Sequence, residues 1–366
     1  MNKTAKISLV SALVCLLFTL LFFLFDLKEL LGFPIILTFA FLSITIRYSD
    51  TYKSLSFTIV VFAAVALAMF YPEFFLNIGT FKFKSLIVPL LQIIMFGMGT
   101  SMSLKDFQSV INTPKGVLIG LICQFTIMPV LGFSIAYLFG FSSEIAAGIV
   151  LIGCCPSGLA SNVMVYLAKA NLALSITLTT ISTLLAPFIT PMLMELLAGE
   201  FIPIDILTMM LSIVKMVILP IVAGLIFNKI FHGKLPWLDR IMPQISMTAI
   251  AFIIIIIVAA GRDKLLEIGL LLIGAAILHN ISGYFFGHWG CKLFKLPESD
   301  CRTIAIEVGM QNGGIASGIA LEIGKVSTVG LPAAIFGPWM NISGSALASW
   351  WKDKPSNPNN PEQEIL

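Results

Sequence analysis

Long apolar stretches alternate with short polar segments along this chain. A helix that crosses the hydrocarbon core of a bilayer needs about 20 mainly apolar residues. Dividing the sequence at charge clusters and at turns that contain Pro or Gly gives twelve such stretches: residues 7–25, 32–47, 54–71, 84–101, 116–139, 145–169, 172–197, 203–230, 242–260, 265–292, 301–323 and 327–351. This pattern predicts an all-α polytopic membrane protein with about twelve spans.

The composition excludes an ordinary soluble domain, since only 11% of the 366 residues are charged and 58% are hydrophobic, whereas soluble domains carry about 25% charged residues. The net charge of +3 does not indicate a nucleic-acid partner. The six cysteines lack the spacing of a zinc site and are interpreted as small apolar side chains. We therefore predict no nucleic-acid partner and no cofactor, and a lipid bilayer as the surroundings.

The distribution of basic residues predicts the orientation. With the N-terminus inside, the inner segments hold 15 of the 22 Lys and Arg residues and the outer segments hold six. Cytoplasmic loops carry an excess of Lys and Arg, so both termini are predicted to be cytoplasmic, in a multi-pass protein of the plasma (inner) membrane. The last segment, 352–366, is rich in Pro, Asn and charge and is predicted to be a disordered tail.

One apolar stretch, 301–323, contains the carboxylate of Glu307, two neighbouring amides and several glycines. A charge at mid-bilayer costs about 2.5–3.5 kcal/mol, and a Gly costs about 1 kcal/mol per helix position relative to Ala. We predict a helix that breaks near Met310 to Gly314, so that unwound carbonyls and Glu307 face a cavity and bind a cation. The alternative is a polar helix interface with a satisfied buried Glu.

A second break is predicted in stretch 145–169, because Pro156 removes a backbone donor and Gly158 relaxes the turn. The segment from 157 to 161 aligns with that from 313 to 317 at an offset of 156 residues, and the same offset takes Gln124 to Asn280. Two units of five spans follow, and because five is odd, the second is inverted relative to the first. Inverted repeats with interrupted helices indicate a secondary transporter.

Isolated polar residues in the neighbouring spans have two interpretations. Ser175 and Thr179 are four residues apart and share one face of a helix. Their hydroxyls either bond the preceding turn or serve as cation ligands, and the amide of Gln124 either bonds a neighbouring helix or binds a ligand. The residues alone leave both interpretations open.

These residues resemble the bile acid:sodium symporter family, especially its bacterial members. The resemblance covers roughly residues 53–351 and is most specific in Phe96–Gly99, in the block from Gly153 through Thr179 to Leu184, in Glu307–Asn312 and in Trp339–Gly344. It implies inverted five-helix repeats at 53–198 and 199–351, which form a panel domain (54–101 and 203–260) and a core domain (116–197 and 265–351) with two crossing broken helices. The hairpin of two N-terminal helices at 1–52 lies outside this core.

The resemblance also implies two sodium sites. By motif matching, the first uses Ser161, Asn162, Ser175, Thr179 and Glu307, and the second uses Gln124, Glu307 and Gln311 with the backbone carbonyls of Val308 and Met310. Hard oxygen donors of this kind suit a hard cation. Asn312, Met340 and Asn341 are the expected substrate contacts, although Met340 stands where several bacterial members have His.

The charge of this site predicts the cargo. Glu307 with two Na⁺ carries a net charge of +1, which a carboxylate or sulfonate neutralises. We therefore expect sodium-coupled symport of an organic anion, either a bile-acid-like sterol anion or a small carboxylate such as pantoate, by alternating access. The oligomeric state is not predicted.

Three other functions compete with this prediction. Glu307 as a proton carrier and arsenite efflux through Cys154 or Cys155 are the competing transport hypotheses. An enzyme is not expected, because the chain has no HExxH, no GxSxG and no paired intramembrane Asp.

Overall fold

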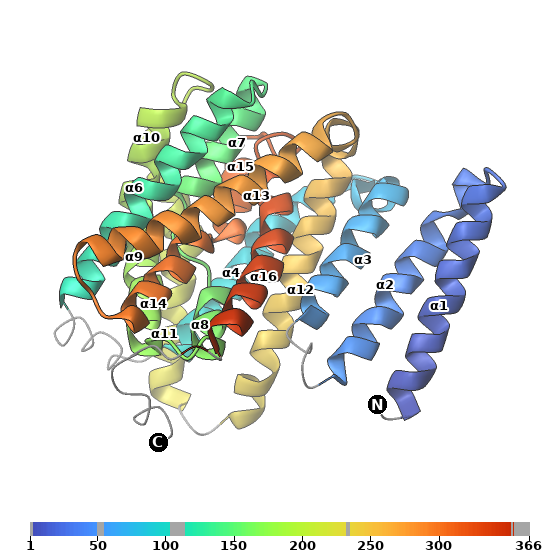
Figure 1. Cartoon of the computed structure of the whole chain (residues 1–366). Helices are drawn as coiled ribbons and strands as arrows, with labels where there is room; N and C mark the ends of the chain where they lie inside the picture. Colours follow the sequence, from blue (N-terminus) through green and yellow to red (C-terminus); the bar gives the residue numbers. More distant parts are fainter. Residues whose placement is uncertain (1–2, 50–54, 103–113, 232–234, 353, 355–366) are drawn as a thin grey trace.

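The computed structural model describes residues 3–49, 55–102, 114–231, 235–352 and 354, and nearly all of them are helical (Figure 1). The predicted tail at 352–366 lies outside the described residues, apart from Lys352 and Lys354. Within the described part of the chain, eight helical stretches are long and apolar enough to cross a membrane. The protein is therefore an all-α polytopic membrane protein.

The helices follow the hydrophobic stretches of the sequence closely. They are α1 (Lys3–Leu24), α2 (Gly32–Arg47), α3 (Ser56–Phe70), α4 (Ile87–Ser101), α6 (Pro114–Leu138), α7 (Ser143–Cys154), α8 (Ala160–Leu167), α9 (Leu172–Ala198), α10 (Ile206–Ile213), α11 (Leu219–Phe231), α12 (Pro236–Ala260), α13 (Arg262–Leu293), α14 (Glu298–Gly309), α15 (Gly313–Glu322) and α16 (Leu331–Lys352). A π-helical segment, Val214–Ile218, joins α10 to α11. Short 3₁₀ turns and a hairpin of β1 (Asn77–Ile78) and β2 (Phe81–Lys82) lie between α3 and α4.

The helices pack in an order that runs across the molecule. At one edge, α1 packs mainly against α2, and α2 packs against α3 (Figure 1). Next, α3 and α4 pack against α12, and α4 also packs against α11. On the other side, α6, α7, α9, α13, α14 and α16 pack among themselves, while α15 contacts both α4 and α16. The short helices α7, α14 and α15 are thus largely buried within the larger group, whereas α8 is partly exposed through Val163 and Tyr166.

Candidate functional site

Two helix breaks meet inside the larger group. The first lies between α7 and α8, where Cys155 is extended and Pro156 has no N–H to continue the helix. The second lies between α14 and α15, where Met310 is extended and Asn312 caps α15 by accepting a hydrogen bond from the amide of Ile315. The break predicted from the sequence near Met310 to Gly314 is therefore present, as is the one around Pro156.

Backbone hydrogen bonds join the two breaks as a short antiparallel bridge between Ser157 and Gln311. The amide of Gly158 donates to the carbonyl of Met310 at 2.9 Å, and the amide of Asn312 donates to the carbonyl of Pro156 at 2.9 Å. A Cβ at Gly158 would lie 2.8 Å from the Gln311 carbonyl oxygen, so only glycine permits this approach. The bridge satisfies backbone groups that the broken helices leave open.

The carboxylate of Glu307 lies next to this bridge and is only 2% exposed. Ser161 Oγ donates to its Oε1 at 2.5 Å and Ser175 Oγ donates to the same oxygen at 2.6 Å, while Thr179 Oγ1 donates to Oε2 at 2.8 Å. Asn162 joins them, because its Oδ1 lies 2.7 Å from Ser175 Oγ, whose single proton can go to either oxygen. The structure therefore brings together all five residues expected at the first sodium site, from α8, α9 and α14.

This cluster has donors for the carboxylate but no positive charge. The ion pairs among the described residues do not include Glu307. A buried carboxylate in a membrane protein needs a compensating charge, and the hydroxyl, amide and carboxylate oxygens around it are the ligand types that a hard cation prefers. The arrangement can bind a small cation such as Na⁺.

A second polar group lies on the other side of the breaks. Gln124 Nε2, on α6, donates to Gln311 Oε1 at 2.9 Å and to the carbonyl of Cys155 at 3.1 Å, and Gln311 Nε2 donates to the carbonyl of Val308 at 2.6 Å. Gln124 Oε1 is buried and has no hydrogen-bond partner among the described residues. None of the hydrogen bonds described for the Glu307 carboxylate joins it to Gln124 or Gln311.

The three residues expected to contact substrate are not joined by any described hydrogen bond. Asn312 uses its side-chain oxygen to cap α15. On α16, the side chain of Met340 is buried, and Asn341 Nδ2 donates to the carbonyl of Gly337 in its own helix at 2.8 Å. Nothing in this arrangement singles them out as a shared binding surface.

Ser157 and Asn280 are polar contributors that the sequence reasoning left without a role. Asn280 Nδ2 donates to the carbonyl of Gly309 at 2.7 Å, just as Gln124 donates to Cys155 at the other break. Ser343 Oγ in turn donates to Asn280 Oδ1 at 2.6 Å. The offset of 156 residues already pairs Gln124 with Asn280 and was the available signal for this role.

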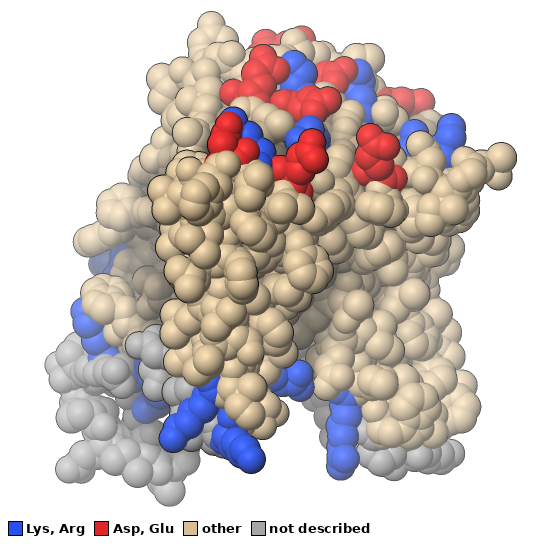
Figure 2. Space-filling model, turned by 90° about the vertical axis from the view of Figure 1, so that its right-hand side faces the viewer, with Lys and Arg blue, Asp and Glu red and all other residues tan. Residues whose placement is uncertain are grey.

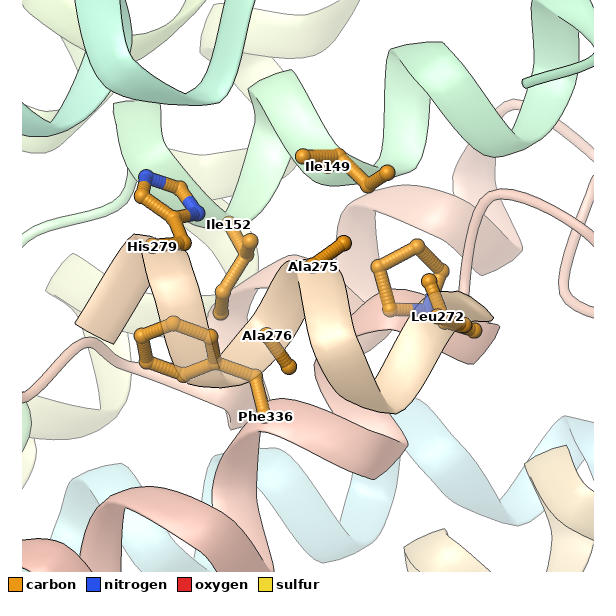
Figure 3. Close-up of a pocket in the computed structure, with 8 residues that line it drawn as sticks. Ile149, Ile152, Leu272, Ala275, Ala276, His279 and Phe336 are labelled. Carbon is orange, nitrogen blue, oxygen red and sulfur yellow. The ribbon is translucent and has the colours of Figure 1, made fainter. Parts of the chain in front are cut away.

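A separate small cavity lies between α7, α13 and α16 (Figure 3). Its walls are apolar apart from the ring of His279, whose Nε2 lies 2.9 Å from the carbonyl of Met128. Its volume of about 10 Å³ leaves room for roughly one water molecule. It is too small for an organic anion and includes no residue of the two polar groups.

Comparisons with known proteins show the family of the chain. The sequence profile of the Sodium Bile acid symporter family matches residues 88–281. The chain is 41% identical over 310 residues to the uncharacterized sodium-dependent transporter YocS of Bacillus subtilis, covering 84% of this chain and 94% of that protein. It is 32% identical to the probable sodium/metabolite cotransporter BASS1, chloroplastic, of Oryza sativa subsp. japonica, covering 83% and 74% of the two chains.

A further relative is the probable sodium/metabolite cotransporter BASS6, chloroplastic, of Arabidopsis thaliana, at 32% identity over 81% of this chain and 74% of that protein. These matches extend over most of the chain and over most of each relative. The chain is therefore a transporter rather than an enzyme, and it belongs to the sodium bile acid symporter family.

Proposed function

We propose that this protein uses the inward movement of Na⁺ to take up an organic anion. The observation that carries the proposal is the buried Glu307 carboxylate, which has three hydroxyl donors and no cationic partner among the described residues. The printed names of its relatives, a sodium-dependent transporter and sodium/metabolite cotransporters, point to the same coupling ion.

The first Na⁺ is proposed to bind among Ser161, Asn162, Ser175, Thr179 and Glu307, whose oxygens already converge. The second is proposed to bind Gln124, Gln311 and Glu307 together with the carbonyls of Val308 and Met310. Its support is the buried, unpartnered Gln124 Oε1, which has a lone pair to offer a cation. Glu307 would have to share its carboxylate with both ions.

The net charge moved in each transport cycle sets the free energy available for accumulating the substrate. Two Na⁺ with one monovalent anion carry one net positive charge inward, which contributes about 2.3 kcal/mol per 100 mV. A tenfold sodium gradient adds about 1.4 kcal/mol for each ion. The sum of about 5 kcal/mol would support roughly a thousandfold accumulation of substrate, or more.

The substrate is proposed to be a sterol-like anion or a small carboxylate. The proposed contacts are Asn312, Met340 and Asn341. To reach the substrate, Asn312 and Asn341 would have to break their present hydrogen bonds, and Met340 would have to become exposed. The small cavity between α7, α13 and α16 includes none of these three residues, and the substrate is proposed to enter when the helix groups separate.

Alternating access is proposed to move the group of α6–α9 and α13–α16 as a core against a panel of α3, α4, α10–α12. Each group takes helices from both proposed inverted repeats, 53–198 and 199–351, and the hairpin at 1–52 precedes the repeats. The packing of the helices supports the division into two groups. The equivalent roles of Gln124 and Asn280 at the two breaks support the inverted repeats. Counting each broken pair, and α10 with α11, as one crossing gives the proposed twelve spans.

The proposed orientation places both termini in the cytoplasm at the plasma membrane. On the face shown in Figure 2, the charged residues described at one end of the molecule are all basic. At the other end, acidic and basic residues are mixed. Helix α1 begins, and α16 ends, toward the basic end (Figure 1). An excess of Lys and Arg is typical of the cytoplasmic side.

Sodium-dependent thermal stabilisation of the purified protein tests the proposal. At constant ionic strength, NaCl should raise the unfolding temperature above that in choline chloride, because a ligand at about 100 times its Kd stabilises the folded state by roughly 2.7 kcal/mol. Glu307→Gln should lose this response while keeping or raising its sodium-free stability, since it removes a buried charge. Glu322→Gln, which alters an exposed carboxylate at the end of α15, should respond like the wild type.

The same preparation then identifies the anion class. Pantoate, pyruvate and taurocholate are added singly in saturating NaCl, and a further shift that disappears in choline chloride marks a coupled substrate. If sodium stabilises the wild type no more than choline does, sodium coupling is refuted and proton transfer by Glu307 becomes the better hypothesis.

A further inference from the structure

Ser157 occupies the point where the two helix breaks touch. It lies between α7 and α8, is only 1% exposed, and forms the antiparallel bridge with Gln311. Its hydroxyl oxygen lies 3.1 Å from the carbonyl oxygen of Glu307, 3.4 Å from that of Met310, and 3.4 Å from Ser161 Oγ. A single hydroxyl thus contacts one ligand of each proposed sodium site, Ser161 and the Met310 carbonyl, together with the Glu307 backbone carbonyl, which is a ligand of neither.

The two ligands belong to different sites. Ser161 is a side-chain ligand of the first proposed site, and it now donates to the Glu307 carboxylate at 2.5 Å. The Met310 carbonyl is a backbone ligand of the second proposed site. It already accepts the amide of Gly158 at 2.9 Å, which leaves it one further lone pair. Either Ser157 or a sodium ion can use that lone pair.

The number of protons limits how these bonds can be arranged. A serine hydroxyl has one proton to donate, and a hydroxyl that binds a cation turns its oxygen toward the ion and its proton away. With Na⁺ in the first site, Ser161 must therefore find an acceptor other than the ion-bound carboxylate oxygen. The hydroxyl oxygens described near it belong to Ser157 and Thr179, both at 3.4 Å, and Thr179 is itself a proposed ligand with the same constraint.

Ser157 is then the acceptor for Ser161, and its own proton goes to the nearer carbonyl, that of Glu307. This choice leaves the remaining lone pair of the Met310 carbonyl free for the second ion. We propose that Ser157 couples the two sodium sites, so that Na⁺ at the first site strengthens binding at the second. Ser157 acts as a positioning residue rather than as a ligand. This inference rests on the proposed sodium symport.

Sodium titrations of the purified full-length protein test the coupling, with the unfolding temperature measured at each NaCl concentration and choline chloride keeping the ionic strength constant. The wild type should show a Hill coefficient clearly above one. Ser157→Ala should lower it to about one and raise the half-maximal sodium concentration about two- to tenfold, the range expected for one lost hydrogen bond. Such a change in cooperativity would not follow from a general loss of packing.

Ser317→Ala is the matched control. Ser317 is buried in the other broken helix pair, and its hydroxyl donates to the carbonyl of Gly313 in its own helix at 2.7 Å. This variant should keep the wild-type Hill coefficient and midpoint. Ser157→Cys, which has a weaker donor of similar size, should give an intermediate Hill coefficient, and it replaces the alanine variant if that protein does not fold.

The possible outcomes separate this inference from the function on which it rests. A wild-type Hill coefficient above one that Ser157→Ala or Ser157→Cys leaves unchanged, with an unchanged midpoint, overturns the coupling role and leaves sodium symport intact. A wild type that does not respond to sodium at all refutes the symport itself. A Hill coefficient of one in the wild type also overturns the coupling.

Discussion

Single polar residues in apolar helices determine the chemistry of this protein. Glu307, Ser161, Ser175 and Thr179 stand out in the sequence because each is costly in a hydrocarbon environment. In the structure these four side chains make direct hydrogen bonds to one another across three helices. The cost of burying a carboxylate drew attention to Glu307, whereas the full set of the first candidate site came from the family resemblance, because the residues alone left the roles of Ser175 and Thr179 open.

Glycine at position 158 allows the two breaks to approach closely, so replacing it should disturb their contact. In Gly158→Ala the new Cβ would lie 2.8 Å from the Gln311 carbonyl oxygen, a backbone atom with little freedom to move. We expect a loss of about 1–3 kcal/mol in stability from overpacking, together with a weaker sodium response. Thermal unfolding with and without NaCl measures both effects.

Gly337→Ala is the control for this prediction, because no atom lies within 4 Å of a Cβ built there in α16. Alanine is also the better helix former by about 1 kcal/mol. The control should be as stable as the wild type or more so. Equal behaviour of the two variants would mean that the close approach of the breaks does not matter for folding.

Other residue contacts could not be predicted from the sequence. Ser157 was noticed only as part of a repeated motif, because a hydroxyl can bond its own helix or a neighbour and the sequence does not say which segment lies opposite. For Met340 and Asn341, the family resemblance predicted a substrate role that the side-chain contacts do not explain. Met340 is buried, and Asn341 forms a hydrogen bond within α16. Side-chain partners between helices depend on packing that hydropathy does not encode.

Hydropathy predicted where the helices lie along the chain better than it predicted irregular turns inside them. The long apolar stretches became helices with similar limits, and Pro156 correctly indicated a break. The π-helical turn Val214–Ile218 was not expected, because one wider turn leaves the apolar periodicity of a buried helix almost unchanged. There, the carbonyl of Lys215 accepts a hydrogen bond from Gln92 Nε2 at 3.2 Å.

Equivalent amides support the ends of both broken helices. The last carbonyls of a helix have no partner within it, and here Gln124 bonds the carbonyl of Cys155 while Asn280 bonds that of Gly309. A helix that ends inside a membrane protein therefore depends on polar groups from a neighbouring span, which is why a lone amide in an apolar stretch carries structural information.

The N-terminal hairpin is expected to be dispensable for sodium binding. Helix α1 packs mainly on α2, and its outward side chains are apolar, as expected for contact with lipid. A variant that lacks residues 2–49 should retain sodium-dependent stabilisation with a midpoint within about twofold of the wild type, because lipid chains can replace α2 against α3. Since the deletion removes two helices, it also preserves the proposed orientation.

Sodium titration of this shortened protein, reconstituted in lipid, checks the prediction. Its own Glu307→Gln form serves as the negative control. A shortened protein that is folded but insensitive to sodium would show that the hairpin affects the ion sites, although it does not pack against the helices that form them.

For the molecule as a whole, the decisive question is whether the two helix groups move against each other. They meet where α15 contacts α4 and the π-helical segment: a Cβ at Gly318 would lie 2.7 Å from Leu91 Cδ2 and 3.1 Å from Met216 Sδ. Such contacts between small and flexible side chains can separate without breaking hydrogen bonds. The sequence predicted the two groups only through the family likeness, because hydropathy does not say which spans move together.

A double variant, Leu91→Cys with Gly318→Cys, tests this movement. Replacing Leu91 removes the side-chain end that would obstruct a new side chain at 318, and oxidation with copper phenanthroline can then join α4 to α15. We expect the crosslink to reduce sodium-driven uptake into proteoliposomes at least about tenfold and dithiothreitol to restore it, because a covalent bond between the groups blocks alternating access. Sodium-dependent stabilisation should survive, since the ion ligands lie in one group.

Glu144→Cys with Lys325→Cys is the matched control. These two side chains form an ion pair between α7 and the segment after α15, within the proposed core. A crosslink there joins parts that are expected to move together, so uptake should continue at nearly the rate of the reduced protein. If the crosslink between α4 and α15 forms completely and uptake is equally undisturbed, the two groups do not separate at this contact, and transport must proceed by a motion inside the core, around the two breaks themselves.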